Sequence, residues 1–248
     1  MTHHITRRHV NAGIGAALIS PAWASAPAFA QGGEPNKIGF SMAQTGSLAG
    51  AGKQALLGAQ IWEKEMNGKG GLLGRPVKLV YYDDQTNPAT VPGIYAKLLD
   101  VDKVDLVIGP YGTNMVAPAL PGVMQKGKTF IGLFALDVNH DFHYPKYFSM
   151  LPSGPTPRQS FTDGFFSVAA AQNPKPQTVA IAAEDAEFSR NAADGARDNV
   201  HTYGFKTVYD RNYPPNMTDF SPIIRAIQAT NPDLVVLCSY PNTSVGLV

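Results

Sequence analysis

The stretch Asn67–Thr90, NGKGGLLGRPVKLVYYDDQTNPAT, decides the fold class of this 248-residue chain. Its glycine-rich start ends an amphipathic helix, because glycine accepts the left-handed backbone that terminates helices. The run Val77–Asp83 then predicts a strand, and Asn87 followed by Pro88 is typical of a helix start. A helix, a strand and another helix in close succession indicate an α/β protein.

Units of this kind recur along the chain. The expected strands span residues 37–41, 77–83, 106–108, 129–134, 147–150, 178–183, 206–213 and 234–238. The expected helices span residues 53–66, 87–102, 115–125, 157–171, 189–202 and 220–229. Strands and helices that alternate through short right-handed crossovers predict parallel sheets flanked by helices.

An irregular segment, Asp137–Pro155, interrupts the alternation, and we interpret it as a crossing between two lobes. We therefore expect a first α/β lobe at residues 36–152 and a second at residues 153–248. The chain stops at Val248, where a further helix is expected to begin. This predicts that the C-terminal part of the second lobe is missing.

Residues 1–30 predict a secretory leader. Arg7 and Arg8 precede a short, weakly apolar run, and the leader ends in Ala28-Phe29-Ala30, a small-residue cleavage signal. The paired arginines favour the twin-arginine export route over the Sec route. A disordered cytosolic N-terminus is the alternative, and the alanine-rich end of the segment argues against it. We expect a periplasmic protein.

Charge and cysteine content exclude several classes of partner. The 20 basic residues include Arg7 and Arg8, so the chain after the leader holds 18 basic and 19 acidic residues. Such a near-neutral surface indicates neither nucleic acid nor an anionic membrane as partner. Cys238 is the single cysteine, and its apolar surroundings predict a small residue in a buried strand.

Two segments resemble a phosphate-binding loop and a metal site, but each lacks the spacing that such a site needs. The loop before the first helix has Ser47 where a phosphate loop needs glycine, and Gln54 follows Lys53. Asp137, His140, Asp141 and His143 have metal-ligand side chains, but they lie in a loop that does not fix their geometry. No nucleophile motif is present, so we expect neither catalysis nor a cofactor or metal.

Polar and aromatic residues follow four of the expected strands, where ligands of open α/β sheets bind. These strand-end residues are Thr45 and Gly46, Thr113 and Asn114, Phe134 and Ala135, and Glu184 to Phe188. Each could merely cap a helix. Four such positions in two lobes favour a cleft.

At this level of detail the chain resembles the extracytoplasmic binding proteins of branched-chain amino acid and amide-type ABC transporters. The resemblance covers residues from Asn36 onward and rests on five segments. They are TGSLAGAGK, NGKGGLLGRPVKLVYYDDQTNPAT, DKVDLVIGP with its Thr/Asn turn, YPPNMTDFSPIIRAIQATNPDLVVL, and Ser239-Tyr240-Pro241. It implies a type I periplasmic binding protein fold, whose two lobes close on a ligand like a trap. It also implies that this chain ends before the return to the first lobe.

The resemblance assigns the carboxylate end of the ligand to two turns. The first falls on Thr113, with Asn114 beside it, and the second on Phe134, Ala135 and Leu136. A hydroxyl residue is expected where Leu136 stands, although its backbone amide can still donate. The tyrosine turn at Tyr240 joins these positions in the expected ligand site.

Other positions depart from an amino-acid binder. The resemblance places Ala51 where an aromatic wall is expected, Phe188 where a tyrosine faces the amine, and Met217 where an acid pairs with the ammonium group. Because an unpaired buried ammonium group is costly, we predict a ligand without an α-amino group. Glu184, or its neighbours Asp185 and Glu187, could replace the missing acid.

The implied function is that of a monomeric, periplasmic substrate-binding component of an ABC importer. It would capture a small aromatic or apolar carboxylate and deliver it to permease subunits in the membrane. Alternatives are branched-chain amino acid or amide binding by the same fold, a cytosolic ligand sensor, and an enzyme on a two-lobed scaffold. An enzyme would need a paired nucleophile and base in the cleft.

Overall fold

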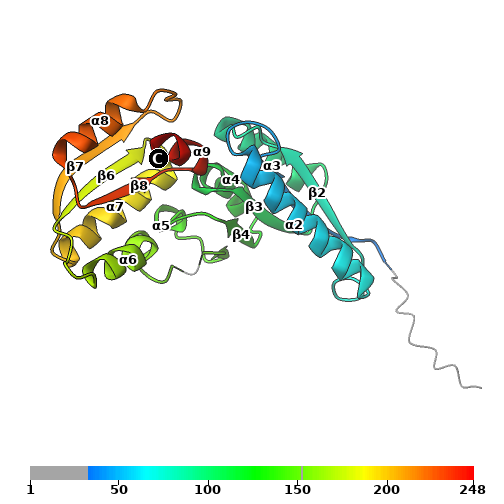
Figure 1. Ribbon diagram of the computed structural model, residues 1–248. Coiled ribbons are helices and arrows are strands. Elements are labelled where there is room, and N and C mark those ends of the chain that lie inside the picture. Colours follow the sequence, from blue (N-terminus) through cyan, green and yellow to red (C-terminus); the bar gives the residue numbers. More distant parts are fainter. Residues whose placement is uncertain (1–32, 152) are drawn as a thin grey trace, which may run out of the picture.

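The computed structural model describes residues 33–151 and 153–248, and the predicted leader at residues 1–30 lies outside the described residues. The described chain forms two lobes of parallel strands with helices on their faces (Figure 1). Strands β1–β5 build the sheet of the first lobe, and β6–β8 build that of the second. The expected architecture of two α/β lobes is confirmed.

The first lobe contains a five-stranded sheet in the order β2-β1-β3-β4-β5, with all neighbouring strands parallel. Its strands are β1 (Asn36–Met42), β2 (Val77–Asp83), β3 (Leu106–Tyr111), β4 (Phe130–Leu133) and β5 (Tyr147–Ser149). Its helices are α2 (Ala49–Gly68), η1 (Pro88–Thr90, a 3-10 turn), α3 (Val91–Asp100), α4 (Thr113–Gln125) and α5 (Asn139–Phe142). From β1 the chain adds β2 on one side and then returns to add β3 on the other, so the strand order switches between β1 and β3. Ligands of open α/β sheets bind beside such a switch point.

Both faces of the first sheet are packed. On one face, Leu56 of α2 packs with Phe40 of β1. On the other face, Tyr95 of α3 and Leu120 of α4 are completely buried together with Phe130 of β4. Burying such a side chain contributes about 1.5–3 kcal/mol, so these contacts hold the helices and their N-terminal turns in place.

The second lobe contains a three-stranded parallel sheet in the order β7-β6-β8. Its strands are β6 (Thr178–Glu184), β7 (Lys206–Tyr213) and β8 (Leu234–Cys238). Its helices are α6 (Pro157–Ala170), α7 (Glu187–Thr202), α8 (Ser221–Thr230) and α9 (Pro241–Leu247). Phe166 and Ala196 pack with Ile181 on one face, and Ile223 packs with Ala182 on the other.

Several expected boundaries were wrong. The strand expected to end at Ile108 continues as β3 to Tyr111, and β4 ends before Phe134, whose φ is +50°. The expected crossing loop contains the short helix α5, and the helix expected from Asn87 begins as the 3-10 turn η1. A helix, α9, already forms at Pro241, where the sequence indicated only that one should begin.

Within the described ranges, no helix combines the length and apolar character needed to cross a membrane.

Candidate functional site

Tyr240 lies where the two lobes meet. It follows β8 as the N-cap residue of α9, and only 6% of it is exposed. Its ring packs against Ala43 and Leu48 of the first lobe and against Ala186 of the second. Its hydroxyl lies 3.5 Å from Oδ1 of Asn114, at the start of α4. Burial raises the pKa of the Tyr240 phenol, so the hydroxyl stays protonated as a hydrogen-bond donor.

Further hydrogen bonds join the lobes at this junction. The backbone N–H of Phe188, in the first turn of α7, donates to Oδ1 of Asn114 at 3.1 Å. Nδ2 of Asn191 donates to the carbonyl oxygen of Leu136 at 3.0 Å. The helix starts of α4 and α7 therefore face one another across the junction.

Gly112 allows the Tyr240 hydroxyl to approach the turn before α4 closely. Its φ of +90° is a conformation that residues with a Cβ rarely adopt, and a Cβ there would lie 2.8 Å from the Tyr240 hydroxyl oxygen. The turn after β3 therefore brings the start of α4 up to Tyr240.

Thr113 and Leu136, both predicted as ligand residues, are fully buried and bonded to each other. The backbone N–H of Leu136 donates to Oγ1 of Thr113 at 2.9 Å. The Leu136 side chain packs in the core of the second lobe, whereas the neighbouring Ala135 packs in the core of the first. The segment after β4 thus ties the two lobes together.

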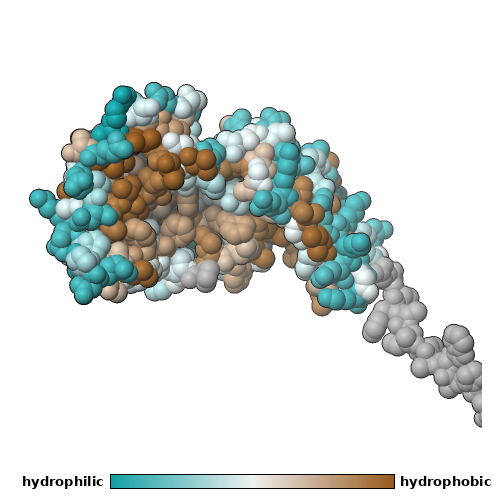
Figure 2. All heavy atoms as spheres, viewed as in Figure 1, coloured by the Kyte–Doolittle hydropathy of each residue, from teal (hydrophilic) through white to brown (hydrophobic). Residues whose placement is uncertain are grey.

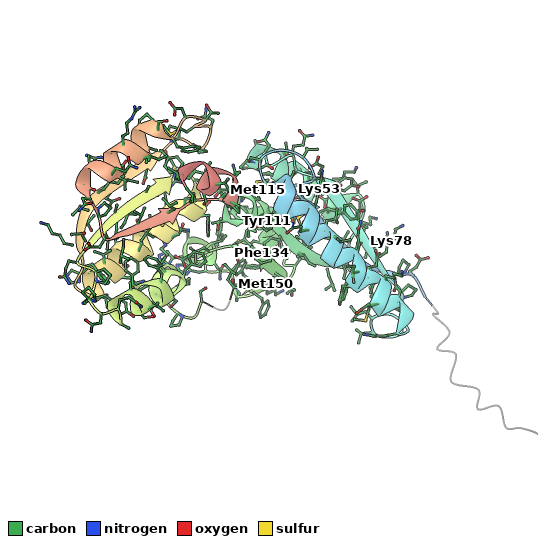
Figure 3. All side chains as sticks on the ribbon, in the orientation of Figure 1. Lys53, Lys78, Tyr111, Met115, Phe134 and Met150 are labelled. Atoms are coloured by element: carbon green, nitrogen blue, oxygen red, sulfur yellow. The ribbon has the colours of Figure 1, made fainter. Side chains whose placement is uncertain are left out.

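An aromatic pocket of about 260 Å³ opens at the junction. Its lining residues are Tyr111, Phe134, Leu151, Phe161, Phe188, Ser239, Tyr240 and Pro241. Figure 2 shows apolar residues over the visible face of the second lobe and toward its junction with the first. Figure 3 shows Tyr111 and Phe134 on the side of the first lobe that faces the second, whereas Lys53 and Lys78 lie farther away.

The aromatic rings of this pocket form one group on each lobe. Tyr111 and Phe134 of the first lobe have ring centroids 5.3 Å apart. In the second lobe, the Phe188 ring lies 5.5 Å from that of Phe161 and 5.1 Å from that of Tyr240. These spacings are typical of interacting aromatic rings.

A polar pocket of about 270 Å³ also has Tyr240 in its lining. Its lining residues are Ser47, Leu48, Thr86, Pro88, Asn114, Met115, Glu184, Pro215, Tyr240 and Asn242. Glu184 is the one charged residue among them, and 5% of it is exposed. Its Oε2 accepts hydrogen bonds from the Thr243 hydroxyl at 2.7 Å and the Tyr240 backbone N–H at 3.3 Å. This carboxylate fixes the start of α9 and lines the pocket.

The structure brings together five of the residues that the sequence singled out. The pocket-lining residues among them are Asn114, Phe134, Glu184, Phe188 and Tyr240. Thr113, Ala135 and Leu136 lie buried behind them.

Two predicted residues, Ala51 and Met217, line neither pocket. Met217 packs instead beside Tyr213 and Phe220, on the α8 face of the second sheet. The identity of residue 217 therefore carries no information about what these two pockets hold.

The neighbours of Glu184 differ in their surroundings. Asp185 is exposed and pairs with Arg190 at 2.8 Å. Glu187 is partly buried, and desolvation raises the pKa of its carboxyl group despite the nearby positive charge of Arg190. Of the three acids, Glu184 is the one that lines a pocket at the junction.

Sequence reasoning missed Tyr111 and Phe161. Tyr111 was placed in a turn, although it is the last residue of β3 and thus at the ligand-binding edge of the sheet. Phe161 is 45% exposed on α6, and so is Phe165 one helical turn later. Two exposed phenylalanines four residues apart on a helix are a signal that could have been used.

The loop with Asp137 and His140 does not form a metal centre. Among the residues that the structure describes, no group of three or more His, Cys, Asp or Glu side chains could hold a metal ion. Asp137 instead forms an ion pair with Arg158.

Comparison with known proteins places the chain in a family. The model of a family described as periplasmic binding protein matches residues 35–248. The chain belongs to the periplasmic binding protein family. The resemblance to binding proteins of branched-chain amino acid transporters is thereby confirmed at the level of the family.

Relatives of this periplasmic binding protein are longer than the chain. It is 26% identical to the Leu/Ile/Val-binding protein homolog 8 of Brucella suis biovar 1 (strain 1330), over 97% of this chain and 59% of the relative. The chain thus spans well under two thirds of the length of this relative.

Solved structures share the fold. The branched-chain amino acid transporter substrate binding protein LivJ from Streptococcus pneumoniae, in complex with isoleucine, has a TM-score of 0.68 at 22% identity. That match covers 82% of this chain and 57% of LivJ. A solute binding protein of an ABC transporter from Rhodopseudomonas palustris BisB5, in complex with 3,4-dihydroxy benzoic acid, has a TM-score of 0.72 at 19% identity. That match covers 85% of this chain and 56% of the chain of the solute binding protein.

Proposed function

We propose that this periplasmic binding protein is the solute-binding component of an ABC importer and captures a small aromatic or apolar carboxylate between its lobes. The observation that carries the proposal is the aromatic pocket at the lobe junction. Family membership supports the binding role, and the structural neighbour with bound 3,4-dihydroxybenzoic acid supports the ligand class.

The pocket suits a flat ring. Tyr111 and Phe134 approach from the first lobe and Phe161 and Phe188 from the second, so a planar ligand would contact aromatic faces or edges from both. Each such pair contributes about 0.5–1.5 kcal/mol beyond the burial of its area. A cavity of about 150 Å³ lined by apolar side chains already holds benzene, so a single ring fits within about 260 Å³.

The charge distribution favours a ligand without an α-amino group. Glu184 is a candidate partner for an ammonium group, but it lines the polar pocket and not the aromatic one. An ammonium group in the aromatic pocket would therefore be desolvated without a carboxylate partner. The ligand carboxylate would accept hydrogen bonds from hydroxyl groups in the lining of the aromatic pocket, such as those of Ser239 and Tyr111.

A branched-chain or other α-amino acid is the second candidate. The specific observation in its favour is the buried carboxylate of Glu184 beside Asn114, which provides an acidic group at the lobe junction. The neighbour in complex with isoleucine supports the same class.

The proposed cycle involves no chemical step. Ligand binding shifts the two lobes toward a closed population, and the closed, exported monomer then docks on permease subunits in the membrane. The polar contacts between Asn114 and Phe188 are part of what such a closed form would gain.

The proposal is tested by calorimetric titration of the full-length protein with 3,4-dihydroxybenzoate. Phe188→Ala should weaken binding by about tenfold, because it removes an aromatic wall worth about 1.4 kcal/mol. Phe148→Ala is the matched control, since Phe148 is 58% exposed on β5 and lines neither pocket. Equal affinities for the two variants, or no binding by the wild type, would contradict the proposal.

A further inference from the structure

Tyr240 is the one residue shared by the linings of the aromatic and polar pockets. Its ring packs with Phe188 of the second lobe and with Ala43 and Leu48 of the first. The two pockets therefore meet at this residue.

Each pocket alone is smaller than a usual small-molecule site. Their volumes are about 260 and 270 Å³, whereas ligand sites typically measure about 300–1,000 Å³. Tyr240 belongs to both linings, so its ring occupies space that a longer ligand would need.

The two spaces differ in chemistry. The aromatic pocket is lined by five rings, including Tyr240 itself. The polar pocket contains the Glu184 carboxylate, whose Oε2 bonds Thr243 and the Tyr240 backbone, and the Asn114 amide. A ligand that spanned both spaces would carry a ring at one end and an ammonium group at the other.

The anchoring of Tyr240 is asymmetric. Its backbone is fixed by Glu184 and by the start of α9, since the N–H groups of Thr243 and Ser244 both donate to the Tyr240 carbonyl oxygen. Its hydroxyl is only 3.5 Å from Asn114 Oδ1, at the long limit of a hydrogen bond. The ring is thus held by packing more than by its hydroxyl.

We propose that the Tyr240 ring is a partition that sets ligand specificity. It confines the ligand to the aromatic pocket and shuts out longer aromatic amines whose ammonium group would reach Glu184. This inference rests on the proposed function, because it assumes that the aromatic pocket receives the ligand.

The test is calorimetric titration of the full-length protein with two probes, 3,4-dihydroxybenzoate and 3-phenylpropylamine. Wild type and Tyr240→Phe should bind the carboxylate and discriminate against the amine, since both keep the ring. Tyr240→Ala should gain at least tenfold in affinity for the amine. Adding Glu184→Gln, which keeps the size of the side chain and removes its charge, should abolish that gain.

Three results would overturn the partition. They are a folded Tyr240→Ala protein with no gain for the amine, an equal gain in Tyr240→Phe, and a gain that survives Glu184→Gln. If Tyr240→Ala does not fold, Tyr240→Leu replaces it, because leucine keeps an apolar contact with Ala43 and Leu48 while removing the ring. A wild type that binds no carboxylate, together with a Tyr240→Ala variant that gains the amine, would refute the proposed function and leave the partition standing.

Discussion

Nε of Arg158 donates to Oδ2 of Asp137 at 2.6 Å, and this ion pair ties the segment after β4 to the first turn of α6. Asp137 belongs to the chain that leaves the first sheet, and its side chain is 9% exposed. Arg158 also reaches Asp194 of α7 at 3.3 Å. The pair therefore fixes how the second lobe is attached to the crossing segment.

Two substitutions of Asp137 should separate the contribution of its charge to stability from the contribution of its backbone conformation. Its φ is +62°, which asparagine tolerates and alanine does not. Asp137→Asn should lower the free energy of unfolding by about 1 kcal/mol, and Asp137→Ala by about 2 kcal/mol. Each kcal/mol corresponds to about 2–4 °C in the melting temperature of a chain of this size.

The control for Asp137 is Asp185→Asn, which removes an ion pair with Arg190 that is exposed on both sides. Its melting temperature should change by less than about 2 °C, because exposed pairs contribute little. Equal melting temperatures for the Asn variants at 137 and 185 would show that the Asp137 pair has no special role.

Two glycine-to-alanine substitutions should change the free energy of unfolding in opposite directions. A Cβ at Gly195 of α7 would lie 1.9 Å from the backbone oxygen of Arg158, so Gly195→Ala should destabilise by about 1–3 kcal/mol as the packed helices move apart. Gly164 is exposed on α6 with nothing within 4 Å of an added Cβ. Gly164→Ala should therefore stabilise by about 0.5–1 kcal/mol. Denaturant titration measures both, and a shift of the same sign would contradict the α6–α7 geometry.

Stability should depend on pH through Glu187. Desolvation raises the pKa of this carboxyl group above its ordinary value of 4.5; Asp141 raises it further, whereas Arg190 and Arg158 lower it. The folded state therefore binds the proton more tightly than the unfolded state, and this stabilisation is lost as the pH rises through the folded pKa. Glu187→Gln should raise the melting temperature at pH 7 relative to wild type, and the difference should shrink toward pH 4.

The control for Glu187 is Glu65→Gln, at a glutamate whose side chain is 64% exposed on α2. It should leave the melting temperature nearly unchanged at both pH values. A Glu187→Gln variant that is less stable than wild type at pH 7 would show that its negative charge stabilises the fold.

Cys238 should be unreactive in the native protein. Burial at the end of β8 raises the pKa of its thiol to about 12, and only 4% of the residue is exposed. Because the thiolate is the reactive form, iodoacetamide should label the native protein very slowly at pH 8 and label it rapidly in denaturant. The sequence contains one cysteine, so labelling reports this site alone. Rapid labelling without denaturant would show that the second lobe opens locally.

The sequence predicted the strands best where an apolar run is bounded by turn residues. The bounds of β2, β7 and β8 were predicted correctly. β3 was cut short because Gly109 and Pro110 are typical turn residues, although here they continue a strand buried in the first sheet. The four-residue helix α5 is too short to show helical periodicity, so no pattern could reveal it.

Part of the candidate site followed from position alone. Asn114 and Phe188 come just after strands, and the topology of parallel sheets brings such positions together. Tyr240 was singled out by the resemblance of its turn to a family pattern. Met217 was assigned by alignment with a family pattern, but the packing of α8 places it beside Tyr213. Phe161 comes from a helix face, and only the approach of the two lobes turns that face into a pocket wall.

The central claim is tested most directly by thermal melting of the full-length protein with 3,4-dihydroxybenzoate and with leucine. A ligand that binds only the native state stabilises it by about 2.7 kcal/mol at a hundredfold excess over its Kd. We predict a melting temperature that rises with the concentration of 3,4-dihydroxybenzoate and does not change with leucine. A rise with leucine and none with 3,4-dihydroxybenzoate would contradict the account and identify an amino-acid binder.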